Sequence, residues 1–139
     1  MLLDAQTGLP KALVSAGYLN GLRTAAANAV AVEYLARSES KVLGVLGAGH
    51  QAGFEIRAIA ARRKLERVKL WSRNPQRADA LRATLLDLEC DIVTFGTPRG
   101  AVESSDLITT VTPSTAALFD AAWVAPGTHI SAMGADTPG

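Results

Sequence analysis

The stretch Lys41-Val42-Leu43-Gly44-Val45-Leu46-Gly47-Ala48-Gly49-His50-Gln51-Ala52 decides the fold of this chain. Residues 41–46 are short, apolar and β-branched, which is typical of a strand buried on both faces. A glycine turn follows directly, and the pattern then predicts a helix over 51–63. A strand, a glycine turn and a helix in this order are typical of a dinucleotide-binding βαβ unit.

The two glycines of the turn are expected to be needed for different reasons. Gly47 allows a tight turn off the strand, and Gly49 has no Cβ, so that the backbone can come close to a pyrophosphate. The free N–H groups at the helix start, aided by the helix dipole, would bind the phosphates. The candidate cofactor-binding residues here are Gly47, Ala48, Gly49, His50 and Gln51. The alternative is a turn that merely joins strand to helix; for His50 we expect an outward-facing side chain, with a catalytic role as the alternative.

Strands and helices alternate along the rest of the chain. The pattern predicts strands over 67–72, 91–95, 106–111 and 128–133, helices over 23–37 and 75–88, and one helical turn near 99–104. Asn20 or Thr24 would cap the first of these helices, and Asn74-Pro75 opens the second. This order predicts an α/β fold, a Rossmann-type doubly wound, mostly parallel sheet with flanking helices and a central strand at 41–46. Residues 1–19 instead predict a strand pair or meander.

The end of the second strand indicates which cofactor the turn would hold. NAD sites place Asp or Glu there for the ribose 2′-hydroxyl, whereas this chain has Trp71-Ser72-Arg73-Asn74, with Arg77 one turn later. Ser72 can donate a hydrogen bond, and Arg73 can pair with a 2′-phosphate. We therefore favour NADP, with NAD possible; the alternative is that Arg73 is a solvated charge.

A third candidate segment is Thr110-Val111-Thr112-Pro113-Ser114, which follows the fourth strand of the unit. It would lie at the carboxyl end of the sheet, where ligands of open α/β sheets bind. Thr110, Thr112, Pro113 and Ser114 are therefore candidate cofactor-binding residues on the nicotinamide side. An ordinary Ser/Thr/Pro turn is an equal alternative.

Composition narrows the classes of function. The net charge of +1 and the isoelectric point of about 7.9 argue against a nucleic-acid partner. The single cysteine, Cys90, fits a reducing compartment, and no apolar run reaches the roughly 20 residues that a membrane helix needs. The N-terminus does not resemble a signal peptide. We expect a cytoplasmic domain with no membrane partner and no metal site.

Several segments together resemble the ornithine cyclodeaminase/μ-crystallin family. They are Leu22-Arg23-Thr24-Ala25-Ala26-Ala27, Leu46–Ala52, Thr112-Pro113-Ser114, Pro126–Ile130 and Gly134-Ala135-Asp136-Thr137-Pro138-Gly139. The resemblance implies hydride transfer between nicotinamide and the α-carbon of a small amino or imino acid, by a cyclodeaminase, an amino-acid dehydrogenase or a ketimine reductase. It also implies that Arg23 holds the substrate carboxylate and that Asp136 is the catalytic acid/base or electrostatic partner of the amine. Without it, both are ordinary solvated charges.

The resemblance further implies that members have a longer chain on both sides. Residues 1–19 would then be the remnant of a preceding substrate and dimerisation domain, and 20–139 the NAD(P)-binding Rossmann domain. The chain would be an incomplete enzyme, acting as a homodimer or with a chain that supplies the missing domain. The alternative is a non-catalytic NADP(H)-binding module. The sequence does not indicate which amino or imino acid is the substrate.

Overall fold

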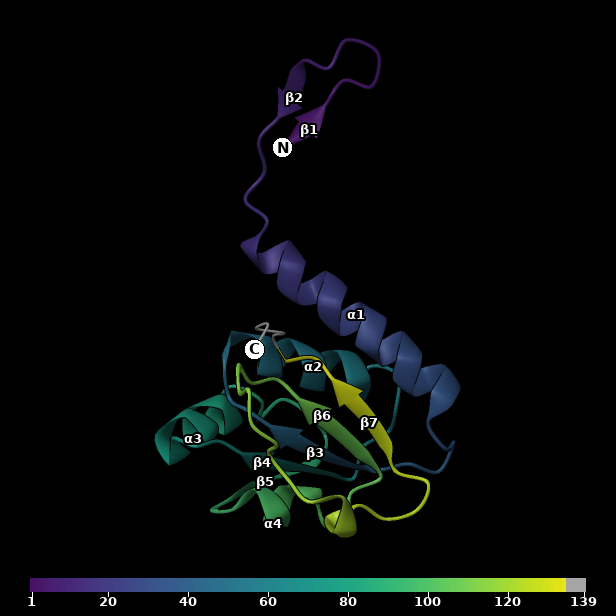
Figure 1. Cartoon of the computed structure of the whole chain (residues 1–139), viewed down its shortest axis with the longest axis vertical. Helices are drawn as coiled ribbons and strands as arrows, with labels where there is room; N and C mark the ends of the chain where they lie inside the picture. The colour runs from purple at the N-terminus through teal and green to yellow at the C-terminus, as the bar shows by residue number, and fades with distance from the viewer. Residues whose placement is uncertain (135–139) are drawn as a thin grey trace.

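The computed structural model describes residues 1–134. Its centre is a five-stranded sheet in the order β5-β4-β3-β6-β7, in which every pair of neighbouring strands is parallel (Figure 1). The strands are β3 (Val42–Leu46), β4 (Arg67–Trp71), β5 (Asp91–Phe95), β6 (Leu107–Thr110) and β7 (His129–Ala132). The predicted parallel α/β sheet with a central strand at 41–46 is therefore confirmed.

Helices cover both faces of this sheet (Figure 1). The larger core cluster joins Leu43 and Val45 of β3 to side chains of α1 (Gly17–Leu35) and α2 (His50–Ala60), and Leu81 of α3 (Pro75–Ala83) packs against it. The smaller cluster, on the opposite face, joins Leu46 of β3 to Val102 of α4 (Pro98–Val102) and to Trp123 of the short 3-10 helix η1 (Ala121–Trp123). Alternate residues of β3 thus face different cores, as a strand buried on both sides requires.

A small antiparallel hairpin of β1 (Leu2–Leu3) and β2 (Pro10–Ala12) precedes α1 and stands away from the sheet (Figure 1). Its apolar side chains are exposed, and Leu13, just after it, is 88% exposed. No helix within residues 1–134 is long and apolar enough to cross a membrane.

Two glycines of the β3 region allow close backbone approaches. At Gly44, an added Cβ would overlap the backbone carbonyl of Ala101 in α4. At Gly47, which has φ +116°, an added Cβ would lie 2.5 Å from the carbonyl oxygen of Val111. Only glycine satisfies both the space and the backbone angle at the second position.

Several expectations about helix and strand limits are wrong: the helix expected over 23–37 is Gly17–Leu35, and the helix expected over 51–63 is His50–Ala60. Gly17-Tyr18-Leu19 belongs to α1, which begins after Ala16 without a side-chain cap, so that neither Asn20 nor Thr24 caps it. The side chain of Asn20 instead accepts hydrogen bonds from Arg23.

The helix expected over 75–88 ends at Ala83. Its last turn tightens because the Thr84 hydroxyl donates to the Leu81 carbonyl at 2.7 Å, and the N–H groups of Leu85 and Leu88 bond three residues back. Such local side-chain bonds compete with continued α-helix. The opening of this helix is as predicted, since the Asn74 side chain accepts from the Arg77 N–H and Pro75 occupies the first turn.

We predict that Gly44→Ala lowers the free energy of unfolding by about 1–3 kcal/mol, because its methyl group would force β3 and α4 apart. Gly53→Ala is the matched control: its Cβ would lie 3.5 Å from Leu81 Cδ1, an ordinary contact. That change should raise stability by roughly 0.5–1 kcal/mol through helix propensity. Denaturant unfolding followed by circular dichroism measures both, and a Gly44→Ala protein as stable as the unmodified chain would contradict the close approach.

Candidate functional site

The candidate site is a cavity of about 530 Å³ outside the carboxyl ends of β3, β4 and β6. The chain leaves β3 for β4 on one side and later returns to β6 on the other, so that the strand order reverses between β3 and β6. In open α/β sheets, ligands bind in the crevice at this reversal. The cavity is lined by Gly47, Ala48, Gly49, Trp71, Ser72, Arg73, Asn74, Arg77, Val111, Thr112, Pro113, Ser114, Thr115, Ala116 and Leu118.

The glycine turn borders this cavity and leads into α2. Gly49 is the N-cap residue of α2, in extended backbone geometry with no side-chain hydrogen bond to the helix. A Cβ built on Gly49 would meet no protein atom within 4 Å, in contrast to Gly47. Gly47 is thus required by the protein's own packing, whereas Gly49 leaves open space in front of the first N–H groups of a helix.

The segment after β4 contributes the charged part of the lining. Ser72 is half-buried, and Arg73 and Arg77 are exposed. Within residues 1–134 neither arginine forms an ion pair, and no Asp or Glu lines the cavity. This end of the cavity therefore favours an anionic group.

The opposite wall is the loop after β6. Thr112 Oγ1 accepts a hydrogen bond from the Ser114 N–H at 3.2 Å, and Ser114 Oγ donates to the Ala116 carbonyl at 3.0 Å. A Cβ on Gly134 would lie 2.5 Å from the Thr112 carbonyl oxygen. The loop is therefore held between the glycine turn and the segment that follows β7.

Nine of the candidate residues from the sequence meet in this one cavity: Gly47, Ala48, Gly49, Ser72, Arg73, Arg77, Thr112, Pro113 and Ser114. Sequence reasoning did not select six further lining residues: Trp71, Asn74, Val111, Thr115, Ala116 and Leu118. Trp71 is the last residue of β4, so the rule that ligands bind at strand ends would have identified it.

Other candidates lie elsewhere. Gln51 and Thr110 do not line this cavity. The Gln51 side chain donates a hydrogen bond to the Gly21 carbonyl. The Thr110 carbonyl accepts one from the Met133 N–H. Arg23 is exposed on α1, where its guanidinium donates to Asn20 Oδ1 at 2.7 Å. Asp136 lies outside the described residues.

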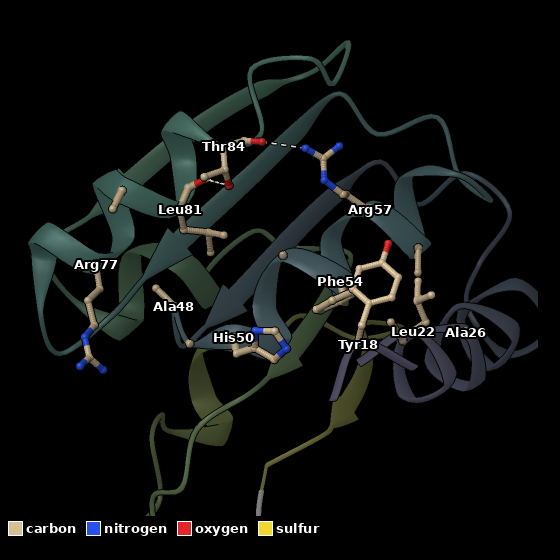
Figure 2. Close-up of a pocket in the computed structure, with 15 residues that line it drawn as sticks. Tyr18, Leu22, Ala26, Ala48, His50, Phe54, Arg57, Arg77, Leu81 and Thr84 are labelled. Carbon is tan, nitrogen blue, oxygen red and sulfur yellow. Dashed lines mark hydrogen bonds between the residues drawn. The ribbon is translucent and has the colours of Figure 1, made fainter. Parts of the chain in front are cut away.

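His50 lines a second, more apolar cavity of about 890 Å³ between α1, α2 and α3 (Figure 2). Its ring packs edge-to-face on Phe54, with ring centres 5.1 Å apart. Figure 2 shows Tyr18 and Leu22 of α1 on one side of this cavity, and Leu81 of α3 with Thr84, which follows α3, on the other. Ala48, Gly49 and Arg77 line both cavities, so the two adjoin at the glycine turn.

Two titratable groups away from the cavity at the glycine turn, the buried Lys69 and the half-buried His129, have lowered pKa values. Burial lowers the pKa of Lys69, whose ammonium bonds to the Glu103 carbonyl at the end of α4. Burial likewise lowers the pKa of His129 in β7, whose Nε2 lies 3.0 Å from Ser131 Oγ. Within residues 1–134, no group of three or more His, Cys, Asp or Glu side chains could hold a metal ion.

Known proteins share this fold and sequence pattern. The Δ1-pyrroline-2-carboxylate reductase of Thermococcus litoralis, solved with NADH and L-proline, is 34% identical with a TM-score of 0.90, over 95% of this chain and 41% of its own. The iminosuccinate reductase of Paracoccus denitrificans, solved with NAD⁺, is 38% identical with a TM-score of 0.87, over 97% and 42%. The ornithine cyclodeaminase of Agrobacterium tumefaciens is 37% identical over 141 residues, which cover 100% of this chain and 40% of the relative.

The chain therefore spans about two fifths of the length of these relatives. The model of the ornithine cyclodeaminase/mu-crystallin family matches residues 1–139, the whole of the sequence. The resemblance inferred from the motifs is thus confirmed, and the chain belongs to the ornithine cyclodeaminase/mu-crystallin family.

Proposed function

We propose that the cavity at the glycine turn binds a nicotinamide dinucleotide. The observation that carries the proposal is the open space in front of Gly49, at the start of α2 and at the point where the strand order reverses. The pyrophosphate would be held by the N–H groups of the α2 first turn, the adenosine side by Ser72 and Arg73, and the nicotinamide side by Thr112 and Ser114. Relatives solved with NADH and NAD⁺ support this assignment.

We infer that the dinucleotide is preferably NADP(H). Arg73 and Arg77 line the cavity without ion-pair partners in the described part of the chain, and no lining residue there is acidic. A 2′-phosphate carries close to two negative charges and needs donors or cations beside it. NAD(H) is the second candidate, because the solved relatives named above contain it.

The reaction that we propose is hydride transfer at the α-carbon of a small amino or imino acid, in the cytoplasm. When bound, the nicotinamide supplies or accepts the hydride. The chain's own residues would bind and orient the dinucleotide, Arg23 would hold the substrate carboxylate, and Asp136 would exchange a proton with the substrate nitrogen or stabilise its charge. Support comes from relatives named as reductases of imino acids and as an ornithine cyclodeaminase.

We further propose that residues 1–19 belong with a substrate and dimerisation domain, and residues 20–139 with the dinucleotide domain. A two-stranded hairpin is at best marginally stable alone, and this one exposes Leu2, Leu3 and Leu9. Such side chains need a partner surface, either in a homodimer or in a chain that supplies a substrate domain.

A non-catalytic NADP(H)-binding module is the second candidate function. It is favoured by one observation: Arg23 bonds to Asn20 and does not line the cavity that holds the glycine turn.

We predict that Gly49→Val removes measurable binding of NADPH and NADH and leaves the unfolding transition unchanged. The backbone of Gly49 is extended, and its Cβ direction is open, so the fold accepts the side chain while the pyrophosphate does not. Gly96→Val is the matched control, since Gly96 is also open and lies outside the cavity. Titration by nicotinamide fluorescence measures both, and unchanged affinity in Gly49→Val would reject the site.

We predict that Arg73→Ala weakens NADPH binding by about ten- to hundredfold, the equivalent of a lost charge-assisted hydrogen bond, and leaves NADH binding nearly unchanged. Ser72→Asp should reverse the preference, because it accepts a ribose hydroxyl and repels a phosphate. The preference should shrink as salt is added. Arg67→Ala is the control, because Arg67 pairs with Asp91 at the other end of β4. Equal affinity of the unmodified chain for NADH and NADPH at low salt would refute the role of Arg73.

We predict that the 139-residue chain binds the dinucleotide but shows no measurable turnover with proline, alanine, ornithine or their imino acids. Orientation of substrate against cofactor is worth roughly 7–11 kcal/mol of a reaction barrier, and Arg23 and Asp136 alone do not provide it. Nicotinamide absorbance in the steady state measures net oxidation or reduction, and release of ammonia measures deamination of ornithine, in which the hydride is returned; Gly49→Val is the blank for both. Efficient turnover by this chain alone would contradict the prediction.

A further inference from the structure

Gln51 lies in the first turn of α2, directly after the glycine turn, but its side chain faces α1. Its Nε2 donates to the Gly21 carbonyl of α1 at 3.1 Å and to Glu55 Oε1, one turn further along α2, at 2.7 Å. Gln51 is half-buried and does not line the cavity beside Gly49. Its side chain therefore connects the start of α2 to a different helix.

Glu55 is the second member of this connection. Its side chain is 0% exposed, and its Oε2 accepts a hydrogen bond from Asn28 Nδ2 of α1 at 2.7 Å. No cation pairs with Glu55 within residues 1–134, so its recorded partners are two side-chain amides. Burial of a carboxylate without a cation is costly, so this group fits a task of orienting its donors better than one of raising stability.

The Phe54 side chain of α2 packs closely on the backbone of α1 at the same place. A Cβ on Gly21 would lie 2.7 Å from the ring of Phe54, which follows Gln51 by three residues. The Phe54 ring also packs edge-to-face on Tyr18 of α1, with ring centres 5.3 Å apart (Figure 2). Gly21 is thus held by the Phe54 ring and by the amide of Gln51.

The start of α2 has no such restraint of its own, because its N-cap residue is Gly49 and no side chain caps it. We propose that Gln51 and Glu55 are positioning residues for the phosphate-binding turn: they fix the first turn of α2 against α1, so that its N–H groups stay directed at the cavity. This inference rests on the proposed dinucleotide site. It also means that the α1 segment carrying Arg23, two residues beyond Gly21, moves together with the turn.

The test uses the full 139-residue chain and NADPH, with NADH alongside. Gln51→Ala should raise the Kd about five- to tenfold, the equivalent of one to two ordinary hydrogen bonds. Glu55→Gln should retain most of the affinity, because the glutamine oxygen can still accept from Gln51. Its NH2 group can donate to Asn28 Oδ1 once the Asn28 amide turns over, since that oxygen has no hydrogen-bond partner in the described part of the chain. Glu55→Ala should resemble Gln51→Ala.

Thr94→Ala is the control for a merely structural effect. It removes the 3.0 Å hydrogen bond from Thr94 of β5 to Asp79 of α3, and neither residue lines either cavity. As long as each protein is folded, a loss of global stability does not change the Kd. Thr94→Ala should therefore bind as the unmodified chain does. An unchanged Kd in Gln51→Ala would overturn the inference, as would an equal loss of affinity in Thr94→Ala.

Hydrogen exchange separates this inference from the proposed function. If the unmodified chain binds neither NADPH nor NADH, the proposed function fails. Exchange of the amides of residues 52–55, which begin at the Ala52 N–H bonded to the Gly49 carbonyl, in the ligand-free chain then still tests the positioning role. Gln51→Ala should speed this exchange and Thr94→Ala should not; equal protection in both would overturn the inference.

Discussion

The backbone of β3 touches two other segments closely enough that no side chain fits between them. At Gly44 the contact is the Ala101 carbonyl of α4, and at Gly47, directly after β3, it is the carbonyl of Val111, directly after β6. The first contact sets how α4 lies on the sheet, and the second sets how the loop after β6 meets the turn after β3. Since β3 is also paired with β4 and β6 along its edges, its position fixes the whole sheet.

The crevice follows from these contacts. At Gly47 the backbone packs directly on the Val111 carbonyl, so that there is no room for a side chain or a ligand between the ends of β3 and β6, and its φ of +116° favours glycine. Two residues later, the backbone of Gly49 is ordinary and its surroundings are open. The two glycines of the motif therefore have different roles: Gly47 is required for packing within the protein, and Gly49 leaves space for a ligand.

Much of this could be predicted from the sequence, because the signals are local. An apolar strand, a glycine turn and alternating strands and helices determine a parallel sheet, and its carboxyl edge then brings 47–49, 72–77 and 112–114 together. The end of α3 could not be predicted, since it depends on a side-chain bond of Thr84 and on Arg57, which donates to the Thr84 carbonyl from α2. The side-chain direction of Gln51 was also beyond reach, because its partner Gly21 lies 30 residues away in α1.

Helix α1 packs on the sheet and is also hydrogen-bonded, near both of its ends, to α2 and to the segment that follows α2. Near the start of α1, the Gln51 side chain of α2 donates to the Gly21 carbonyl. Near the end of α1, Arg63, which follows α2, donates to four carbonyls, those of Val32, Glu33, Ala36 and Ser38. Two helices joined at two separated points cannot pivot about either one. The hairpin of β1 and β2 precedes α1, so its attachment runs through a helix whose orientation is set by the phosphate-binding helix. A surface that packs on the exposed leucines of the hairpin would thus be linked, through α1, to the turn where the cofactor's pyrophosphate is proposed to bind.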